Sequence, residues 1–232
     1  MSSFASDEEQ LEALKRWWKE NGSSLLSGIA IVLVVWFGFG QFRDSRENAS
    51  VGASLLYEQI AGLAASSITT GVSEDDLLAA QSLYSQLKAD HDSSVYTRYA
   101  ALMMARFHVE QQQLPQAAAE LQWVLDNPDI GFLREADEEI FIVARLRLGR
   151  IKLAQDDAQG ALALIQAQSV PEEFAPGFGE LEGDIQMALG NQDAARVAYQ
   201  NALLAILGMG NGNPAVLQLK LQDLGVNPVG ML

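Results

Sequence analysis

Residues 22–42 constrain this chain more than any other stretch, because they contain no charged side chain. As a helix, a segment of this length rises roughly 32 Å, which is enough to cross a bilayer core of about 30 Å. Basic residues flank it, with Lys19 before it and Arg43 directly after it. A buried helix of a soluble domain is the alternative, but such helices rarely stay apolar all round for so long. The pattern therefore predicts a transmembrane helix.

The same stretch is typical of an uncleaved anchor and not of a signal peptide, whose apolar region is about 7–15 residues long. No Ala-x-Ala pattern follows Phe42. Basic residues near a span mark its inner side, and here they favour an inner N-terminus by a narrow margin. Those before the span are Lys15, Arg16 and Lys19, and those after it are Arg43 and Arg46. We therefore expect residues 1–21 to be a cytoplasmic tail and residues 43–232 to lie across the membrane.

The tail has the pattern of a short amphipathic helix. Ser6 is followed three residues later by Glu9, which is a capping-box sequence. Leu11, Leu14 and Trp18 recur at helical spacing and share one face. That face fits either membrane lipid or a partner protein.

The composition excludes several classes of function. The net charge is −15, and so acidic a surface repels phosphate backbones, which argues against nucleic-acid binding. The chain has no cysteine, which excludes disulfides and thiolate metal sites. A hydrophobic content of 49% with 19% charged residues is typical of a folded protein.

Beyond a turn-rich loop at residues 66–73, helical patterns alternate with short breakers, and no segment shows sustained period-two alternation. We therefore expect an all-α fold. Within it, small residues, turn residues and large apolar residues recur at an offset of 34. The matched pairs are Gly149 with Gly183, Asp156 with Gly190, Ala161 with Ala195, and Ile165 with Tyr199. This period and pattern are those of a tetratricopeptide repeat, in which small residues let two helices approach closely.

The register extends toward the N-terminus with an insertion around residues 129–139. The residues in register are Ala105, Ala117 and Leu121, and before them Ala80 and Tyr84. Residues 43–232 are therefore expected to form a tetratricopeptide-like α-solenoid of about four repeats. A final short helix at residues 214–224 would cap its end. The alternative is a set of generic helical hairpins in which the small residues recur by chance.

The sequence contains no recognisable catalytic constellation. His91 and His108 lack a second ligand at metal spacing. Acidic pairs such as Asp156 with Asp157 stand at expected helix starts, where they stabilise the helix dipole. The glycines at residues 208–212 lack the lysine of a phosphate loop. We therefore expect neither an enzyme nor a cofactor.

A solenoid of this kind presents a concave groove lined by the first helix of each repeat, suited to an extended or helical peptide. Two arginines in the groove would bind carboxylates. The alternative is that the same residues only pack against the amino-terminal hairpin. The groove-facing candidates are Tyr99, Leu102, Arg106, Val109, Leu146, Arg150, Leu153, Asp184 and Met187.

The opening of the chain resembles the YfgM family, the ancillary Sec-translocon subunits of Gram-negative bacteria. The most specific part is the block Glu-Gln-Leu-x-x-Leu-Lys-x-Trp-Trp-Lys-x-Asn-Gly at residues 9–22. One apolar span and tetratricopeptide-like helices follow it, so the resemblance covers the whole chain.

The resemblance implies an inner-membrane anchor with a cytoplasmic tail and a periplasmic repeat domain. It also implies association with the SecYEG channel and with a membrane-anchored periplasmic chaperone of the prolyl-isomerase type. Such a protein would help exported client polypeptides leave the channel, and its tail would act on a cytoplasmic regulator of envelope stress. The resemblance assigns no individual binding residue.

Two other classes of function stay open. One is a scaffold for cell-envelope assembly that contacts no unfolded client, and the other is a membrane-tethered regulator that works through its tail. Deletion of residues 1–20 separates them, because a scaffold or chaperone should tolerate the deletion and a tail-driven regulator should not.

Overall fold

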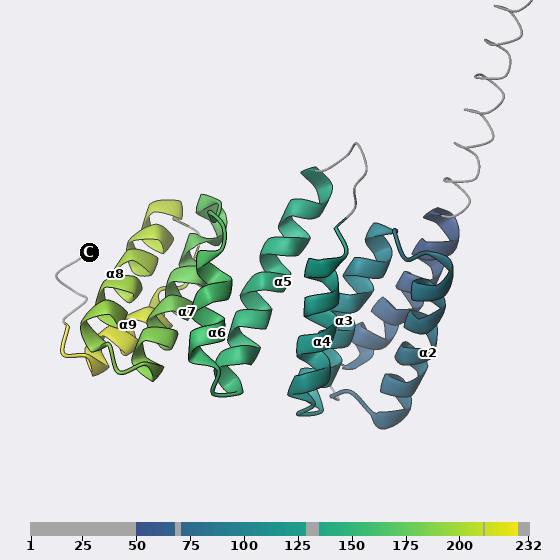
Figure 1. Ribbon diagram of the computed structural model, residues 1–232, viewed down its shortest axis with the longest axis horizontal. Helices are drawn as coiled ribbons and strands as arrows, with labels where there is room; N and C mark the ends of the chain where they lie inside the picture. Colours follow the sequence, from purple (N-terminus) through teal and green to yellow (C-terminus); the bar gives the residue numbers. More distant parts are fainter. Residues whose placement is uncertain (1–49, 68–70, 129–134, 211, 227–232) are drawn as a thin grey trace, which may run out of the picture. The chain divides into compact units, whose positions relative to one another are not determined.

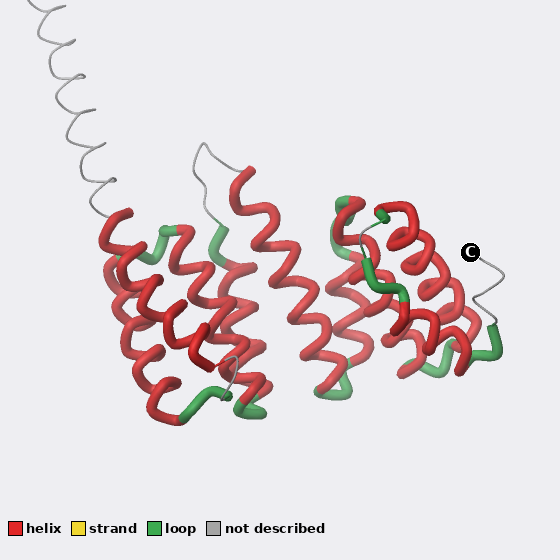
Figure 2. The backbone as a smooth tube through the Cα atoms, turned by 180° about the vertical axis from the view of Figure 1, so that it is seen from behind, coloured by secondary structure: helices red, strands yellow, loops and turns green. Residues whose placement is uncertain are grey.

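A computed structural model describes residues 50–67, 71–128, 135–210 and 212–226. Across these residues the regular structure is helical, and no strand occurs in them, which confirms the all-α fold (Figure 2). Residues 50–67 are helical and precede the labelled elements. These are α2 (Glu74–Asp90), α3 (Val95–Glu110), α4 (Leu114–Asp126), α5 (Glu135–Ala154), α6 (Ala158–Gln166), the 3₁₀ helix η1 (Glu172–Phe174), α7 (Ala175–Ala188), α8 (Gln192–Met209) and α9 (Ala215–Asp223).

The chain divides into two units, Met1–Gly52 and Ala53–Leu232. The predicted tail and span lie in the first unit, outside the described residues. In the part of the chain that the structure describes, no helix combines the length and apolar character that crossing a bilayer requires. The second unit contains all the labelled helices.

Within the second unit, each labelled α-helix from α2 to α9 packs against its sequence neighbours (Figure 1). In addition α3 contacts α5, and α5 contacts α7. We call α3, α5 and α7 the A row, and α4, α6 and α8 the B row. Short turns join each A-row helix to the following B-row helix, so the two run antiparallel. Sequential packing of this kind is that of a tetratricopeptide-like domain.

The turns between the rows repeat one backbone conformation at the predicted offsets. The residue two before each B-row helix has a positive φ: 59° at Gln112, 64° at Asp156 and 79° at Gly190. The amide after each of them donates to the carbonyl five residues earlier. These bonds run from Gln113 to His108 (2.7 Å), from Asp157 to Lys152 (2.9 Å) and from Asn191 to Gln186 (2.8 Å). The alignment of Asp156 with Gly190 is therefore confirmed, and it extends to Gln112.

Small residues stand where the rows cross, as the register predicts. A Cβ atom on Gly149 would lie 2.8 Å from Leu181 Cδ2 and 3.4 Å from Ile165 Cγ2. On Gly183 it would lie 2.2 Å from the ring of Tyr199. The other residues in register are also buried, namely Ala80, Tyr84, Ala105, Ala117, Leu121, Ala161, Ala195 and Ile165.

The buried apolar residues form three clusters along the second unit. The first runs from Ala53 to Ile151 and joins the opening helices to α5. The second lies between α5, α6 and α7 and includes Phe178 and Leu181. The third joins α8 to α9 and includes Leu203 and Leu221.

Helix α9 covers the last B-row helix with Leu217 and Leu221, which are buried. Leu219, on the opposite face of the helix, is 61% exposed. At the end of α9, Gly225 has a φ of 74°, and the Val226 amide donates to the Leu221 carbonyl over 2.9 Å. These are the features that end the A-row helices, so α9 terminates as an A-row helix does.

Candidate partner-binding face

The predicted groove residues all lie on A-row helices. Four come from α3, three from α5 and two from α7. We call the solvent-exposed side chains of α3, α5 and α7 the A-row face. Not all nine candidates belong to it, because contacts between the A-row helices themselves bury some of them.

The three predicted leucines take part in packing to different extents, and of these only Leu102 is buried instead of open to the groove. Leu102 is only 8% exposed and belongs to the first apolar cluster. Leu146 and Leu153 are half-buried against the second cluster, and Leu146 fills the space beside Gly177. The apolar side chains that do reach solvent on the A-row face are Tyr99, Val109 and Met187.

The two predicted arginines differ in how their charge is compensated. Arg106 Nε is 2.6 Å from Glu110 Oε1 one turn further along α3, and its Nη2 donates to Ser67 Oγ over 3.4 Å. The Arg150 side chain is 52% exposed, and its Nη2 is 4.0 Å from Glu180 Oε2, at the outer limit of an ion pair. The charge of Arg106 is thus compensated by a close carboxylate, whereas the charge of Arg150 is compensated less completely by a more distant one.

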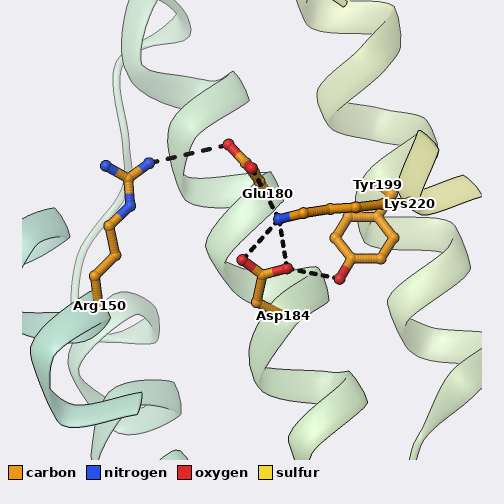
Figure 3. A network of polar contacts seen from close by, with 5 residues as sticks. All are labelled: Arg150, Glu180, Asp184, Tyr199 and Lys220. Carbon is orange, nitrogen blue, oxygen red and sulfur yellow. Dashed lines mark hydrogen bonds and ion pairs between the residues drawn. The ribbon is translucent and has the colours of Figure 1, made fainter. Parts of the chain in front are cut away.

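Asp184 takes part in a structural ion network (Figure 3). Lys220, from α9, places Nζ 2.6 Å and 2.9 Å from the two carboxylate oxygens of Asp184, and 2.8 Å from Glu180 Oε1. The Tyr199 hydroxyl donates to Asp184 Oδ1 over 2.7 Å. Asp184, one of the predicted groove residues, therefore fastens α9 to α7.

The pKa values within this network follow from burial and hydrogen bonding. Burial raises the pKa of Tyr199, and its hydrogen bond to Asp184 raises it further. Burial acts to lower the pKa of Lys220, but its bonds to Asp184 and Glu180 outweigh this effect and raise it. Lys220 consequently stays charged and holds both acids.

Arg147 belongs to the A-row face but was not among the predicted residues. Its Nη1 donates to the Leu102 carbonyl of α3 over 3.3 Å. Burial lowers the pKa of Arg147, and the charges of Arg150 and Arg106 lower it further. The signal available in the sequence was its position three residues before Arg150, which places both on one side of a helix. We call Arg106, Arg147 and Arg150 the arginine cluster.

His108 has a structural role. It is buried, and its Nδ1 lies 2.7 Å from Gln113 Oε1 across the turn between α3 and α4. Lys152 with Asp157 and Gln186 with Asn191 bridge the two later turns in the same way.

The tetratricopeptide repeat-like domain family matches residues 15–226 of this chain. The ancillary SecYEG translocon subunit of Escherichia coli is 25% identical over 97% of this chain and 100% of its own length. The corresponding subunit of Haemophilus influenzae is 24% identical over 87% and 91%, and that of Neisseria gonorrhoeae 25% over 97% and 100%. No solved structure matches the chain.

These similarities confirm the resemblance that the opening block carries, because they extend over nearly the whole chain. The family match also spans all the helices that the structure labels. The chain belongs to the tetratricopeptide repeat-like domain family.

Proposed function

We propose that this chain is a non-enzymatic ancillary subunit of the Sec translocon. In this proposal it is anchored in the inner membrane by residues 22–42, with residues 1–21 in the cytoplasm and residues 43–232 in the periplasm. The observation that carries the proposal is the end-to-end similarity to ancillary SecYEG translocon subunits.

In the periplasm the A-row face would bind polypeptide, either exported client segments or a membrane-anchored chaperone of the prolyl-isomerase type. Exposed Tyr99, Val109 and Met187 offer apolar contact, and the arginine cluster offers donors for carboxylates. Anchoring next to the channel raises the effective concentration of emerging chains, so weak contacts suffice.

Protease added to spheroplasts tests the topology. We expect it to digest the domain that follows residue 43 and to spare the tail, because only the former would be exposed at the outer surface. Antibodies against each end of the chain follow the two fragments, and lysed cells provide the control in which both ends are digested. A repeat domain that stays intact in sealed spheroplasts contradicts the assignment.

Photo-crosslinking tests the binding face. A photoreactive residue at position 99 should capture nascent exported chains and the chaperone, and the double reversal Arg106→Glu with Arg150→Glu should reduce that yield several-fold because the donors for carboxylates are gone. Arg196→Glu, on the B row, is the control and should leave the yield unchanged. Circular dichroism first establishes that each variant is folded. Wild-type yield in the double variant would place binding elsewhere.

A further inference from the structure

The packing of α3 against α5 brings three guanidinium groups to one part of the A-row face. Arg147 of α5 reaches the Leu102 carbonyl of α3, one helical turn before Arg106. Arg150 follows Arg147 by three residues on α5, and so lies on the same side of that helix. The arginine cluster is therefore built by tertiary packing and not by one sequence motif.

Among the residues that the structure describes, Glu110 and Glu180 are the acids that form ion pairs with this cluster. Glu110 is paired with Arg106 at 2.6 Å. Glu180 lies 4.0 Å from Arg150 but only 2.8 Å from Lys220, which holds it. Arg147 makes no ion pair with any residue that the structure describes. A local excess of positive charge therefore remains on a chain whose net charge is −15.

Such an excess is costly, because the three like charges repel one another. A ligand with carboxylates would relieve the repulsion. Guanidinium groups suit this role, since they bind carboxylates in bidentate fashion. Tyr99, two turns before Arg106, and Val109, three residues after it, are exposed on the same helix. They supply apolar contact beside the charges.

From these contacts we infer that the arginine cluster selects acidic segments of the polypeptides that the A-row face binds, with Arg147 as its central residue. The inference rests on the proposed function. Glu180 competes with the ligand for Arg150, and Lys220 limits that competition by holding the Glu180 carboxylate.

The test uses the full chain in detergent micelles and fluorescence anisotropy of a labelled peptide of alternating glutamate and serine. Counterpart peptides replace glutamate with glutamine or with lysine. We expect the acidic peptide to bind most tightly and its affinity to fall with salt. Arg147→Gln should weaken binding by about tenfold, as loss of a charged hydrogen bond does. Glu180→Gln should strengthen it about threefold, because a partly exposed competitor is removed.

Arg196→Gln is the matched control, since it removes the same charge from the B row and should leave the affinity unchanged. If Arg147→Gln does not fold, Arg150→Gln takes its place. Equal affinity for the three peptides, an Arg147→Gln affinity equal to the wild type, or no binding of the acidic peptide overturns the inference. So does self-association of the chain that Arg147→Gln abolishes, because the cluster would then bind a second copy. None of these results depends on the crosslinks to exported chains, which test the proposed function separately.

Discussion

Replacing Gly183 with alanine is expected to lower the free energy of unfolding by about 1–3 kcal/mol. The added methyl group would lie 2.2 Å from the Tyr199 ring, and that ring is buried and held by its hydroxyl on Asp184. Neither helix nor ring can retreat without breaking other contacts. Urea denaturation of the full chain, followed by circular dichroism, measures the change.

Two further glycines provide an internal scale for this experiment. Gly149→Ala should lower the free energy of unfolding by a smaller amount, because the nearest neighbour of the added methyl group is the flexible end of Leu181. Gly208→Ala, within α8, meets nothing within 4 Å and should stabilise the helix by about 0.5–1 kcal/mol. If Gly183→Ala were as stable as Gly208→Ala, the close crossing of α7 and α8 would be wrong.

Lys220→Met should destabilise the C-terminal end by about 1–2 kcal/mol, since it leaves two partly buried carboxylates without their shared cation. Methionine keeps most of the apolar stem, so the loss reports on charge. The same denaturation measures it, and the double variant with Asp184→Asn tests coupling. We expect Asp184→Asn to lower the free energy of unfolding by less in the Lys220→Met background than in the wild type.

The control for Lys220→Met is Arg196→Met. Arg196 Nη1 is 2.6 Å from Asp193 Oδ1, but that carboxylate is 95% exposed, so the pair should contribute less than about 0.5 kcal/mol. Its Nη2 also donates to the Leu224 carbonyl at the end of α9, but at 3.5 Å this hydrogen bond is long and weak. Equal costs for the two substitutions would show that the ion network does not fasten α9.

Sequence alone predicted the repeat register because that register depends on local constraints. A small residue must stand at each crossing and a turn residue between the helices, so Gly149, Gly183 and Asp156 were recognisable. The insertion before α5 was also recognisable as a change of offset from 34 to 44. Part of it lengthens α5, which spans 20 residues against 14 in α7.

The candidate site was less predictable, because it depends on which long side chains meet across helices. Leu102 occupies a face that the register assigns to the groove, but contact between α3 and α5 buries it. Glu180 has both Arg150 and Lys220 within reach, and only the packing of α9 decides which it holds more closely. Arg147 belongs to the site for the same reason, because its contact with the Leu102 carbonyl depends on the packing of α5 against α3.

The division of the apolar interior into three clusters has a consequence for cooperativity. Each cluster is shared only by neighbouring helices, so loss of one does not remove the contacts that hold the others. The third cluster is covered at the C-terminal end by α9, which has only 9 residues. Amide protons there should exchange with solvent sooner than those of α3, and thermal melting should spread from that end instead of occurring in one step.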